Sequence, residues 1–196
     1  MSELIFYYGA MGCGKTSELL KTRFGMIEDG FKVIVVKPFV DKKGGSYIVA
    51  RDGSKVEVDF LIKKKDNVYL DISKYLVDNN LDYILVDEAQ FLTEEQVDQL
   101  SDVVDILEIK VICYGLKNNY KGKLFEGAKR LIEIADNISE IKRKCSCGSK
   151  KSFNVRFIDG KAVFDGDEIA IDGIDAEYSA VCRSCYKKIY KENKEK

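Results

Sequence analysis

The sequence predicts an α/β fold, in which helices flank a parallel sheet and a small metal-bound domain follows at the C-terminal end. Three observations predict it. Short apolar runs alternate with longer amphipathic stretches, a glycine-rich segment follows the first apolar run, and two close pairs of cysteines lie after residue 144. Such alternation is typical of strand–helix–strand units, which bury a parallel sheet between two layers of helices.

Four apolar runs are predicted to be strands of this sheet. They cover residues 3–8, 32–36, 82–86 and 109–114. The middle two are almost wholly apolar, which is typical of strands that are buried on both faces of a parallel sheet. Phosphate-binding and metal-binding groups are then expected at the carboxyl ends of the strands.

The amphipathic stretches between these runs are predicted to be helices, because apolar residues recur in them at helical spacing. They cover residues 15–28, 71–79, 93–105 and 124–135. Thr93 and Gln96 form a capping-box pattern, in which each side chain can bond to the backbone N–H of the other residue. This pattern predicts that a helix begins directly after Thr93.

Length and charge narrow the class of protein. A chain of 196 residues can bury one sizeable core and a small appended module. Its 32 basic and 33 acidic residues give a net charge of -1. The chain therefore lacks the overall excess of positive charge that is typical of proteins that bind nucleic acid or an anionic membrane. The N-terminal segment does not read as a signal peptide, and no apolar run approaches the length of a membrane span. We therefore expect a cytoplasmic protein that binds neither nucleic acid nor membrane.

The segment GAMGCGKT, residues 9–16, matches the phosphate-binding pattern Gly-x4-Gly-Lys-Thr. Its glycines let backbone N–H groups converge on phosphate oxygens, Lys15 can reach the outer phosphates, and Thr16 can supply a hydroxyl to Mg²⁺. Because the segment lies between a predicted strand and a predicted helix, it predicts a P-loop (RecA-like) domain that binds ATP. The residues assigned to ATP in this loop are Gly9, Ala10, Met11, Gly12, Cys13, Gly14, Lys15 and Thr16.

A second motif, DEAQF, ends the predicted strand at 82–86. In a P-loop protein the acid at the end of such a strand helps to hold Mg²⁺, and Asp87 has that position. The neighbouring carboxylate, Glu88, can take a proton from the attacking water or hydroxyl group. The motif is also similar to a helicase box, but helicases of that kind need two motor domains, and this chain is long enough for one.

A third pattern consists of the pairs Cys145-x-Cys147 and Cys182-x2-Cys185. Four thiolates in two close pairs suit a closed tetrahedral Zn²⁺ site, which can hold together a module too small to fold alone. The chain contains no histidine, so such a site must be all cysteine. Unliganded thiols and a nucleic-acid-binding zinc ribbon are the alternatives. Lysines flank the pairs as a ribbon requires, but few aromatic residues are interleaved with them.

The change of composition near residue 142 predicts a domain boundary. We expect a nucleotide-binding domain over residues 1–141 and a zinc-binding domain over residues 142–196. The lysine-rich segment from Lys187 to Lys196 is expected to be a solvated, frayed tail.

Taken together, these motifs resemble those of the cellular-type (type II) thymidine kinases over nearly the whole chain. The resemblance rests on the P-loop with its internal Met11, the motif at 87–91, the stretch from Gly115 to Phe125, the cysteine pairs, and the Gly-x4-Tyr loop from Gly173 to Tyr178. Each piece is common alone, but their order and spacing are specific to this family.

The resemblance implies transfer of the ATP γ-phosphate to the 5′-hydroxyl of thymidine, with Mg²⁺ as cofactor, a structural Zn²⁺ and a homotetrameric assembly. It implies that Glu88 is the general base. In the DEAQF motif, the residues implied to flank ATP and Mg²⁺ are Asp87, Glu88, Ala89 and Gln90. Those implied to line the nucleoside pocket are Phe91, Leu116, Tyr120, Phe125 and Tyr178, the last within a lasso-like lid at 168–180. Ordinary core packing is the alternative role for these aromatic residues.

The sequence departs from the family pattern in two places. Lys117, Asn118 and Asn119 stand where the family has acidic residues, which removes negative charge near the implied pocket. Ile174 replaces the second of two glycines in the lasso, which limits the freedom of its backbone.

Arg51 and Asp52 fall where the family has a short segment with an arginine or histidine. Arg51 is assigned to the neutralisation of phosphate charge, and Asp52 to the orientation of the acceptor.

A thymidine kinase is therefore the preferred function. A divergent kinase of another deoxynucleoside, a P-loop ATPase and a zinc-dependent nucleic-acid module are the alternatives. ATP hydrolysis without any nucleoside would indicate the ATPase, and salt-sensitive binding to DNA or RNA would indicate the nucleic-acid module.

Overall fold

The computed structural model describes residues 2–39, 45–166 and 176–194. Its centre is a parallel sheet of six strands in the order β5-β2-β6-β7-β1-β8. In chain order the strands are β1 (Leu4–Tyr8), β2 (Val33–Pro38), β5 (Phe60–Ile62), β6 (Tyr83–Val86), β7 (Lys110–Gly115) and β8 (Asn137–Glu140). The four predicted strands are confirmed and form the centre of the sheet. Sequence reasoning missed β5 and β8, which are short strands at its two edges.

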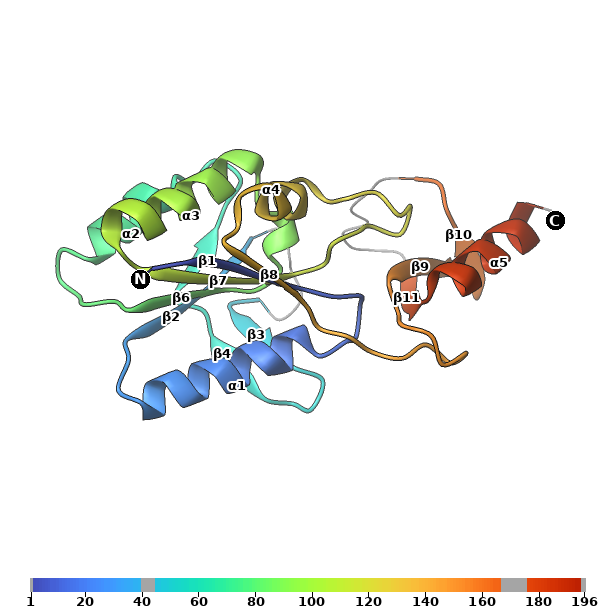
Figure 1. The fold of residues 1–196 in the computed structure, drawn as a ribbon, viewed down its shortest axis with the longest axis horizontal. Coiled ribbons are helices and arrows are strands. Elements are labelled where there is room, and N and C mark those ends of the chain that lie inside the picture. Colours follow the sequence, from blue (N-terminus) through green and yellow to red (C-terminus); the bar gives the residue numbers. More distant parts are fainter. Residues whose placement is uncertain (1, 40–44, 167–175, 195–196) are drawn as a thin grey trace.

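Helices cover both faces of the sheet (Figure 1). One face is covered by α1, and the other by α2, α3 and α4. The bounds of these helices are α1 (Lys15–Glu28), α2 (Val68–Tyr75), α3 (Glu94–Leu107) and α4 (Glu126–Ile134), and a short 3-10 helix η1 (Ala89–Phe91) lies between β6 and α3. All four predicted helices are present, which confirms the α/β class.

Two helix starts show how side chains set the boundaries. The capping box at α3 is confirmed, because Thr93 Oγ1 accepts the N–H of Gln96 at 3.1 Å and Gln96 Oε1 accepts the N–H of Thr93 at 3.2 Å. By contrast, α2 begins three residues before the predicted position, since the side chain of Asn67 accepts the N–H of Leu70 at 3.0 Å and caps the helix there.

A small antiparallel hairpin of β3 (Tyr47–Val49) and β4 (Lys55–Glu57) lies on the α1 side of the sheet (Figure 1). The sequence analysis did not predict it. Ile48 of β3 is 2% exposed and packs with Leu19 of α1 in the core on that side. The hairpin is therefore anchored to the α/β domain, and its turn lies at residues 50–54.

A second module follows β8 and lies at one end of the molecule (Figure 1). It contains an antiparallel sheet of β9 (Phe153–Ile158), β10 (Lys161–Val163) and β11 (Ala176–Val181), in the order β10-β9-β11, and the helix α5 (Arg183–Lys194). The expectation of a frayed tail from Lys187 is wrong for residues 187–194, which are helical. The rings of Tyr186 and Tyr190 pack against Phe164 at 5.5 and 4.9 Å between centroids, and this contact holds the helix on the module.

One region of interest, the predicted lasso, lies partly outside the described residues. Of the predicted lasso at 168–180, only residues 176–180 are described, and they belong to β11. Gly173 and Ile174 lie outside the described residues. Among the helices of the described ranges, none combines the length and the apolar character that a membrane crossing requires.

Candidate active site and metal centre

The P-loop connects β1 to α1 in a tight path that depends on its glycines. Gly9 donates its N–H to the carbonyl of Gly115 at 3.2 Å, and Gly14 caps α1 with a positive φ of 97°. A Cβ on Gly9 would lie 2.4 Å from the Sγ of Cys13 and 2.7 Å from the carbonyl of Ile141. A side chain at Gly9 would therefore clash with backbone, and one at Gly14 would require the left-handed region that favours glycine.

Lys15 lies inside the curve of this loop. It is 8% exposed, and its Nζ donates to the carbonyl of Ala10 at 3.2 Å. Its ammonium group therefore faces the space that the loop encloses, where an anion would be bound. Thr16, the next residue, lies in the first turn of α1 and is partly exposed.

Asp87 and Glu88 follow β6 at the same edge of the sheet. Asp87 is 5% exposed and its N–H bonds to the carbonyl of Val36 at 3.0 Å. Glu88 has a φ of 51°, in the left-handed region that a non-glycine residue occupies only when its surroundings enforce it. Such conformations occur at functional sites and also at turns and helix ends, as at Glu108 and Asp159, so the conformation of Glu88 agrees with the motif but does not identify it alone.

The Glu88 carboxylate is oriented by a chain of hydrogen bonds. Gln90, which is 1% exposed, donates its Nε2 to Glu88 Oε2 at 2.5 Å. The Oε1 of the same amide accepts the N–H of Leu116 at 2.8 Å. Because both ends of the Gln90 side chain are bonded, the direction of the Glu88 carboxylate depends on the loop that follows β7. Ala89, between the two, is fully buried.

The residues implied for the nucleoside pocket fall into two groups. Phe91, Leu116 and Phe125 lie together, with the rings of Phe91 and Phe125 edge to face at 5.6 Å. Leu116 and Phe125 are buried within the main core, so packing accounts for part of their role. Tyr120 and Tyr178 form the second group. Tyr120 is 2% exposed and donates its hydroxyl to the carbonyl of Asp165 at 3.0 Å, whereas Tyr178 lies half-buried on β11.

Arg51 and Asp52 lie in the turn of the β3–β4 hairpin. A Cβ on Gly12 would be 2.9 Å from both terminal nitrogens of Arg51, so the guanidinium lies directly against the P-loop. Asp52 Oδ1 accepts from the backbone N–H and the hydroxyl of Ser54, at 3.0 and 2.5 Å, and these bonds lower the pKa of the Asp52 carboxyl. The structure thus brings Arg51 to the phosphate loop, while the bonds of Asp52 hold its own turn.

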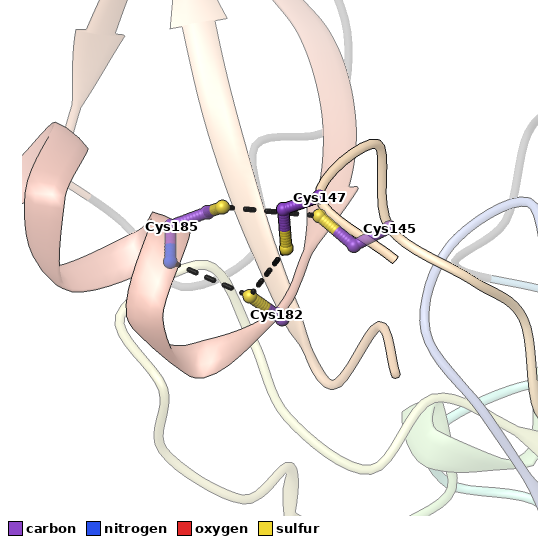
Figure 2. A group of neighbouring side chains, drawn as sticks. All are labelled: Cys145, Cys147, Cys182 and Cys185. Carbon is purple, nitrogen blue, oxygen red and sulfur yellow. Dashed lines mark hydrogen bonds between the residues drawn. The ribbon is translucent and has the colours of Figure 1, made fainter. Parts of the chain in front are cut away.

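The four C-terminal cysteines meet in one cluster (Figure 2). Their sulfur atoms all lie within 4.8 Å of one another, with Cys147 and Cys182 at 3.4 Å and Cys145 and Cys185 at 4.0 Å. Four thiolates around a tetrahedral Zn²⁺ would be about 3.8 Å apart, given a Zn–S bond of about 2.3 Å. The donor set and its spacing therefore fit zinc.

Backbone donors prepare this cluster for a cation. N–H groups of Cys147 and Cys182 lower the pKa of the Cys145 thiol to about 6, which favours the thiolate that a metal requires, whereas hydrogen bonds with the neighbouring thiols, that of Cys182 first, raise the pKa of Cys185 to about 12. The N–H of Cys185 points to the Sγ of Cys182 at 3.5 Å from the start of α5. The cysteines join the segment before β9 to the start of α5, and so hold together the ends of the small sheet.

Asn154 connects this module to the P-loop, and sequence reasoning missed it. The side chain is 4% exposed; its Oδ1 accepts the N–H of Met11 at 2.9 Å, and its Nδ2 donates to the carbonyl of Asn118 at 2.9 Å. Arg143, just before the cysteines, also donates to the P-loop, at the carbonyl of Gly12. No motif marks either residue, because each acts through its place in the fold.

A hollow lies at the junction between the two parts of the molecule. It is lined by residues from both parts, namely Tyr8, Gly9, Ala10, Lys117, Asn118, Glu140, Ser152 and Asn154. The P-loop backbone thus forms one wall of this hollow, and the module forms another.

Comparisons with known proteins agree with these observations. A family model described as "Thymidine kinase" matches residues 2–186. The protein named "Thymidine kinase" of Francisella tularensis subsp. holarctica (strain LVS) is 40% identical over 195 residues, which cover 95% of this chain and 98% of that protein. Its counterpart in Pasteurella multocida (strain Pm70) is 41% identical over 189 residues, which cover 95% and 97%.

One solved structure that matches shows a weak likeness. The crystal structure of Bacteroides Pif1 bound to ssDNA matches with a TM-score of 0.40 and 15% identity, and the match covers 71% of this chain and 38% of that one.

Removal of the Asn154 amide should loosen the P-loop. In Asn154→Ala the Met11 N–H and the Asn118 carbonyl both lose a partner, and unpaired buried polar groups cost about 1–3 kcal/mol each. We expect a lower free energy of unfolding and a higher dissociation constant for ATP, measured by denaturation and calorimetry. Ser152→Ala, in the same hollow, is the control. Wild-type values for both quantities in Asn154→Ala would show that this junction has no role.

Loss of one cysteine ligand should release the metal and destabilise the module. Cys145→Ser should lower the bound metal from one ion per chain to a small fraction and reduce the melting temperature, because a structural zinc contributes directly to the folding free energy. Elemental analysis and calorimetry measure both. Cys13→Ser, outside the cluster, should keep its metal. Metal-free wild-type protein with an unchanged melting temperature would contradict the assignment.

Proposed function

Because this chain belongs to the thymidine kinase family, we propose that it transfers the γ-phosphate of ATP to the 5′-hydroxyl of thymidine. The family match over residues 2–186 carries this proposal. The local geometry supports it, since a phosphate loop and a strained carboxylate lie at the same edge of one sheet.

The P-loop is proposed to hold the phosphates of ATP. Its backbone N–H groups and the buried ammonium of Lys15 would face the β- and γ-phosphates, with the positive end of α1 behind them. Arg51, which lies against Gly12, would add positive charge from the hairpin. Thr16 and Asp87 are the residues that would hold Mg²⁺, which neutralises the charge of the transferred phosphoryl group when bound.

Glu88 is proposed to be the general base. Its carboxylate would accept the proton of the 5′-hydroxyl while the nucleoside oxygen forms a bond to the γ-phosphorus and the bond to the β-phosphate oxygen breaks, which leaves ADP and thymidine monophosphate. Gln90 would keep the carboxylate aimed at the acceptor, because its amide is fixed at the other end by Leu116. Ala89, between them, would fix the turn by its burial.

The nucleoside is proposed to lie between the loop that follows β7 and the zinc module. Phe91, Leu116 and Phe125 would contact one side of it, and Tyr120 and Tyr178 the other. Asp52 would act on the acceptor side only through the turn that presents Arg51. The module would exclude water from the phosphoryl group, since a kinase must favour the hydroxyl over water.

Further parts of the proposal concern the cofactor and the state of the protein. We propose Zn²⁺ as the ion in the cysteine cluster, on the basis of its four-sulfur geometry. We further propose a homotetramer without nucleic-acid partners, on the basis of family membership, and a location in the cytoplasm, because none of the six cysteines forms a disulfide.

A panel of nucleosides assayed with ATP and Mg²⁺ tests the substrate. Thymidine should give the highest kcat/KM, and deoxyuridine should be about four- to fivefold lower, because it lacks one buried methyl group. Purine deoxynucleosides should show little turnover, since their bases are too large for a pyrimidine pocket. A purine deoxynucleoside that turns over faster than thymidine would leave a divergent kinase, and nucleoside-independent ATP hydrolysis would indicate an ATPase.

Glu88→Gln tests the general base. It keeps the size of the side chain but cannot accept the proton, so kcat should fall by about 100-fold or more while the dissociation constants of ATP and thymidine change little. Single-turnover kinetics and calorimetry separate these effects. Glu94→Gln, an exposed carboxylate at the start of α3, is the control. A kcat within a few-fold of wild type would exclude this role for Glu88.

A further inference from the structure

Arg156 is a buried cation on β9 that faces two tyrosines. It is 5% exposed, and its guanidinium carbon lies 5.6 Å from the centroid of the Tyr120 ring. It lies directly opposite Tyr178 in the pairing of β9 with β11, so the two side chains share a face of the small sheet. Burial raises the pKa of the Tyr178 hydroxyl, and the nearby charge of Arg156 opposes this shift.

Within the described residues, the guanidinium lacks the partners that a buried charge needs. None of the ion pairs found there includes Arg156, and its buried Nε has no hydrogen-bond partner. The contact that the structure shows between Arg156 and Tyr120 is with the face of the ring, while the Tyr120 hydroxyl donates to the carbonyl of Asp165. An unpaired buried charge is costly, so the arrangement favours a ligand that supplies an acceptor.

Other unpaired polar atoms gather in the same region. Among the residues that the structure describes, Asn118 Oδ1 and Asn119 Nδ2 are also buried without a hydrogen-bond partner, and they lie on the loop that leads into Tyr120. The carbonyl of Asn118 accepts from Asn154, two residues before Arg156 on the same strand. The junction of this loop with β9 therefore concentrates unsatisfied groups, which a well-packed interface between two protein segments would avoid.

The position of Arg156 indicates which part of a ligand it would meet. Asn154 contacts the P-loop at Met11, and Arg156 lies on the same face of β9, one side-chain repeat away, or about 6.6 Å. This offset places the guanidinium beyond the phosphate loop rather than on it. Two aromatic rings, suited to a flat base, lie beside it.

We propose that Arg156 is a substrate-binding and specificity residue that donates a hydrogen bond from its guanidinium to a carbonyl oxygen of the pyrimidine base. The proposal rests on the proposed function, because it names a contact within that nucleoside site. A charged donor in a buried position strengthens the binding of a base that offers a carbonyl oxygen and weakens the binding of one that offers an amino group there. At the 4-position this contact would favour thymine over cytosine, which carries an amino group there; at the 2-position, where both bases carry a carbonyl, it would add affinity without that preference.

The test combines variants of Arg156 with altered bases. Arg156→Met removes the donors but keeps an apolar stem, and it should raise the KM for thymidine by about 10- to 100-fold, the scale of a lost hydrogen bond from a charged group. The KM for ATP should stay within about twofold, since the P-loop is contacted by Asn154 instead. Lys121→Met is the matched control, because Lys121 also lies over the Tyr120 ring, at 5.8 Å, but is partly exposed.

Substrates in which sulfur replaces one carbonyl oxygen, 2-thiothymidine and 4-thiothymidine, separate recognition from structural support. Sulfur is the weaker acceptor, so one of them should be a poorer substrate than thymidine for the wild-type enzyme, and that difference should disappear in Arg156→Met. A merely structural role would leave the difference the same in both proteins. Equal differences in the two proteins, no difference in the wild type, or an unchanged KM for thymidine would each overturn the proposal.

Two further measurements keep the test decisive. Metal content and melting temperature show whether Arg156→Met is folded; if it is not, Arg156→Lys, which keeps the charge but loses the Nε donor, replaces it in the same comparison. A wild-type enzyme that phosphorylates no pyrimidine nucleoside would defeat the proposed function itself. If the wild type phosphorylates thymidine but the Arg156 variant has the same KM for thymidine and the same response to the thio-substituted bases, only the role of Arg156 is excluded.

Discussion

The pairing order of β6, β7 and β1 is the constraint on which the rest of the molecule depends. These strands run parallel and adjacent, so the segments that follow them emerge at one edge of the sheet. The P-loop follows β1, Glu88 follows β6, and Leu116 follows β7. Direct bonds join these segments, from Gly9 to the carbonyl of Gly115 and from Leu116 to Gln90. A shift of one residue between the strands would separate the carboxylate from the loop, because each side chain would turn to the other face.

The small module depends on the same edge but is held by different forces. Its sheet has three strands, too few to bury a core of its own, so the cysteine cluster ties the ends of the sheet together. Attachment to the α/β domain is polar. Asn154 and Arg143 bond to the backbone of the P-loop, and Tyr186 donates to the carbonyl of Tyr120 at 2.8 Å. A metal bound by the cysteines would therefore stabilise the same module whose strand β9 contacts the P-loop through Asn154.

The sequence predicted the parts of this protein whose chemistry is local. The central strands, the capping box at Thr93 and the phosphate motif each have a signal within a few residues, and all are present in the structure. The edge strand β8, with its exposed Asn137 and Ile138, lacks such a signal, since only its pairing with β1 makes it a strand. The helix α5 was missed because its apolar face is a few aromatic residues among lysines, which become a helix face only against Phe164. Asn154 and Arg156 could not be found for the same reason, as their partners are distant in the chain.

The structure shows what Lys117, Asn118 and Asn119 contact at the positions where the family pattern has acidic residues. Lys117 places its ammonium over the ring of Tyr8, at 5.4 Å, and thus points toward the hollow beside the P-loop. Asn118 Nδ2 donates to the carbonyl of Gly122 at 2.8 Å, and Asn119 Oδ1 accepts from the backbone of Lys121 and Lys123, each at 3.0 Å. These amides hold the loop by bonding to its own backbone, a role that suits a neutral side chain.

An acid at one of these positions would bring a carboxylate to the loop beside Tyr120, where Arg156 and Lys121 are neighbouring cations. Within the described residues, the neutral loop leaves the guanidinium without such a counter-charge. Two effects then compete. The loss of an ion pair makes the junction between β9 and the loop less stable, while a donor that no carboxylate occupies remains available to a ligand. Because the guanidinium cannot give up its proton, its charge must be compensated by whatever fills the site. The composition of this loop therefore makes the stability of the junction depend on the bound ligand, and a polar acceptor in that ligand would strengthen it.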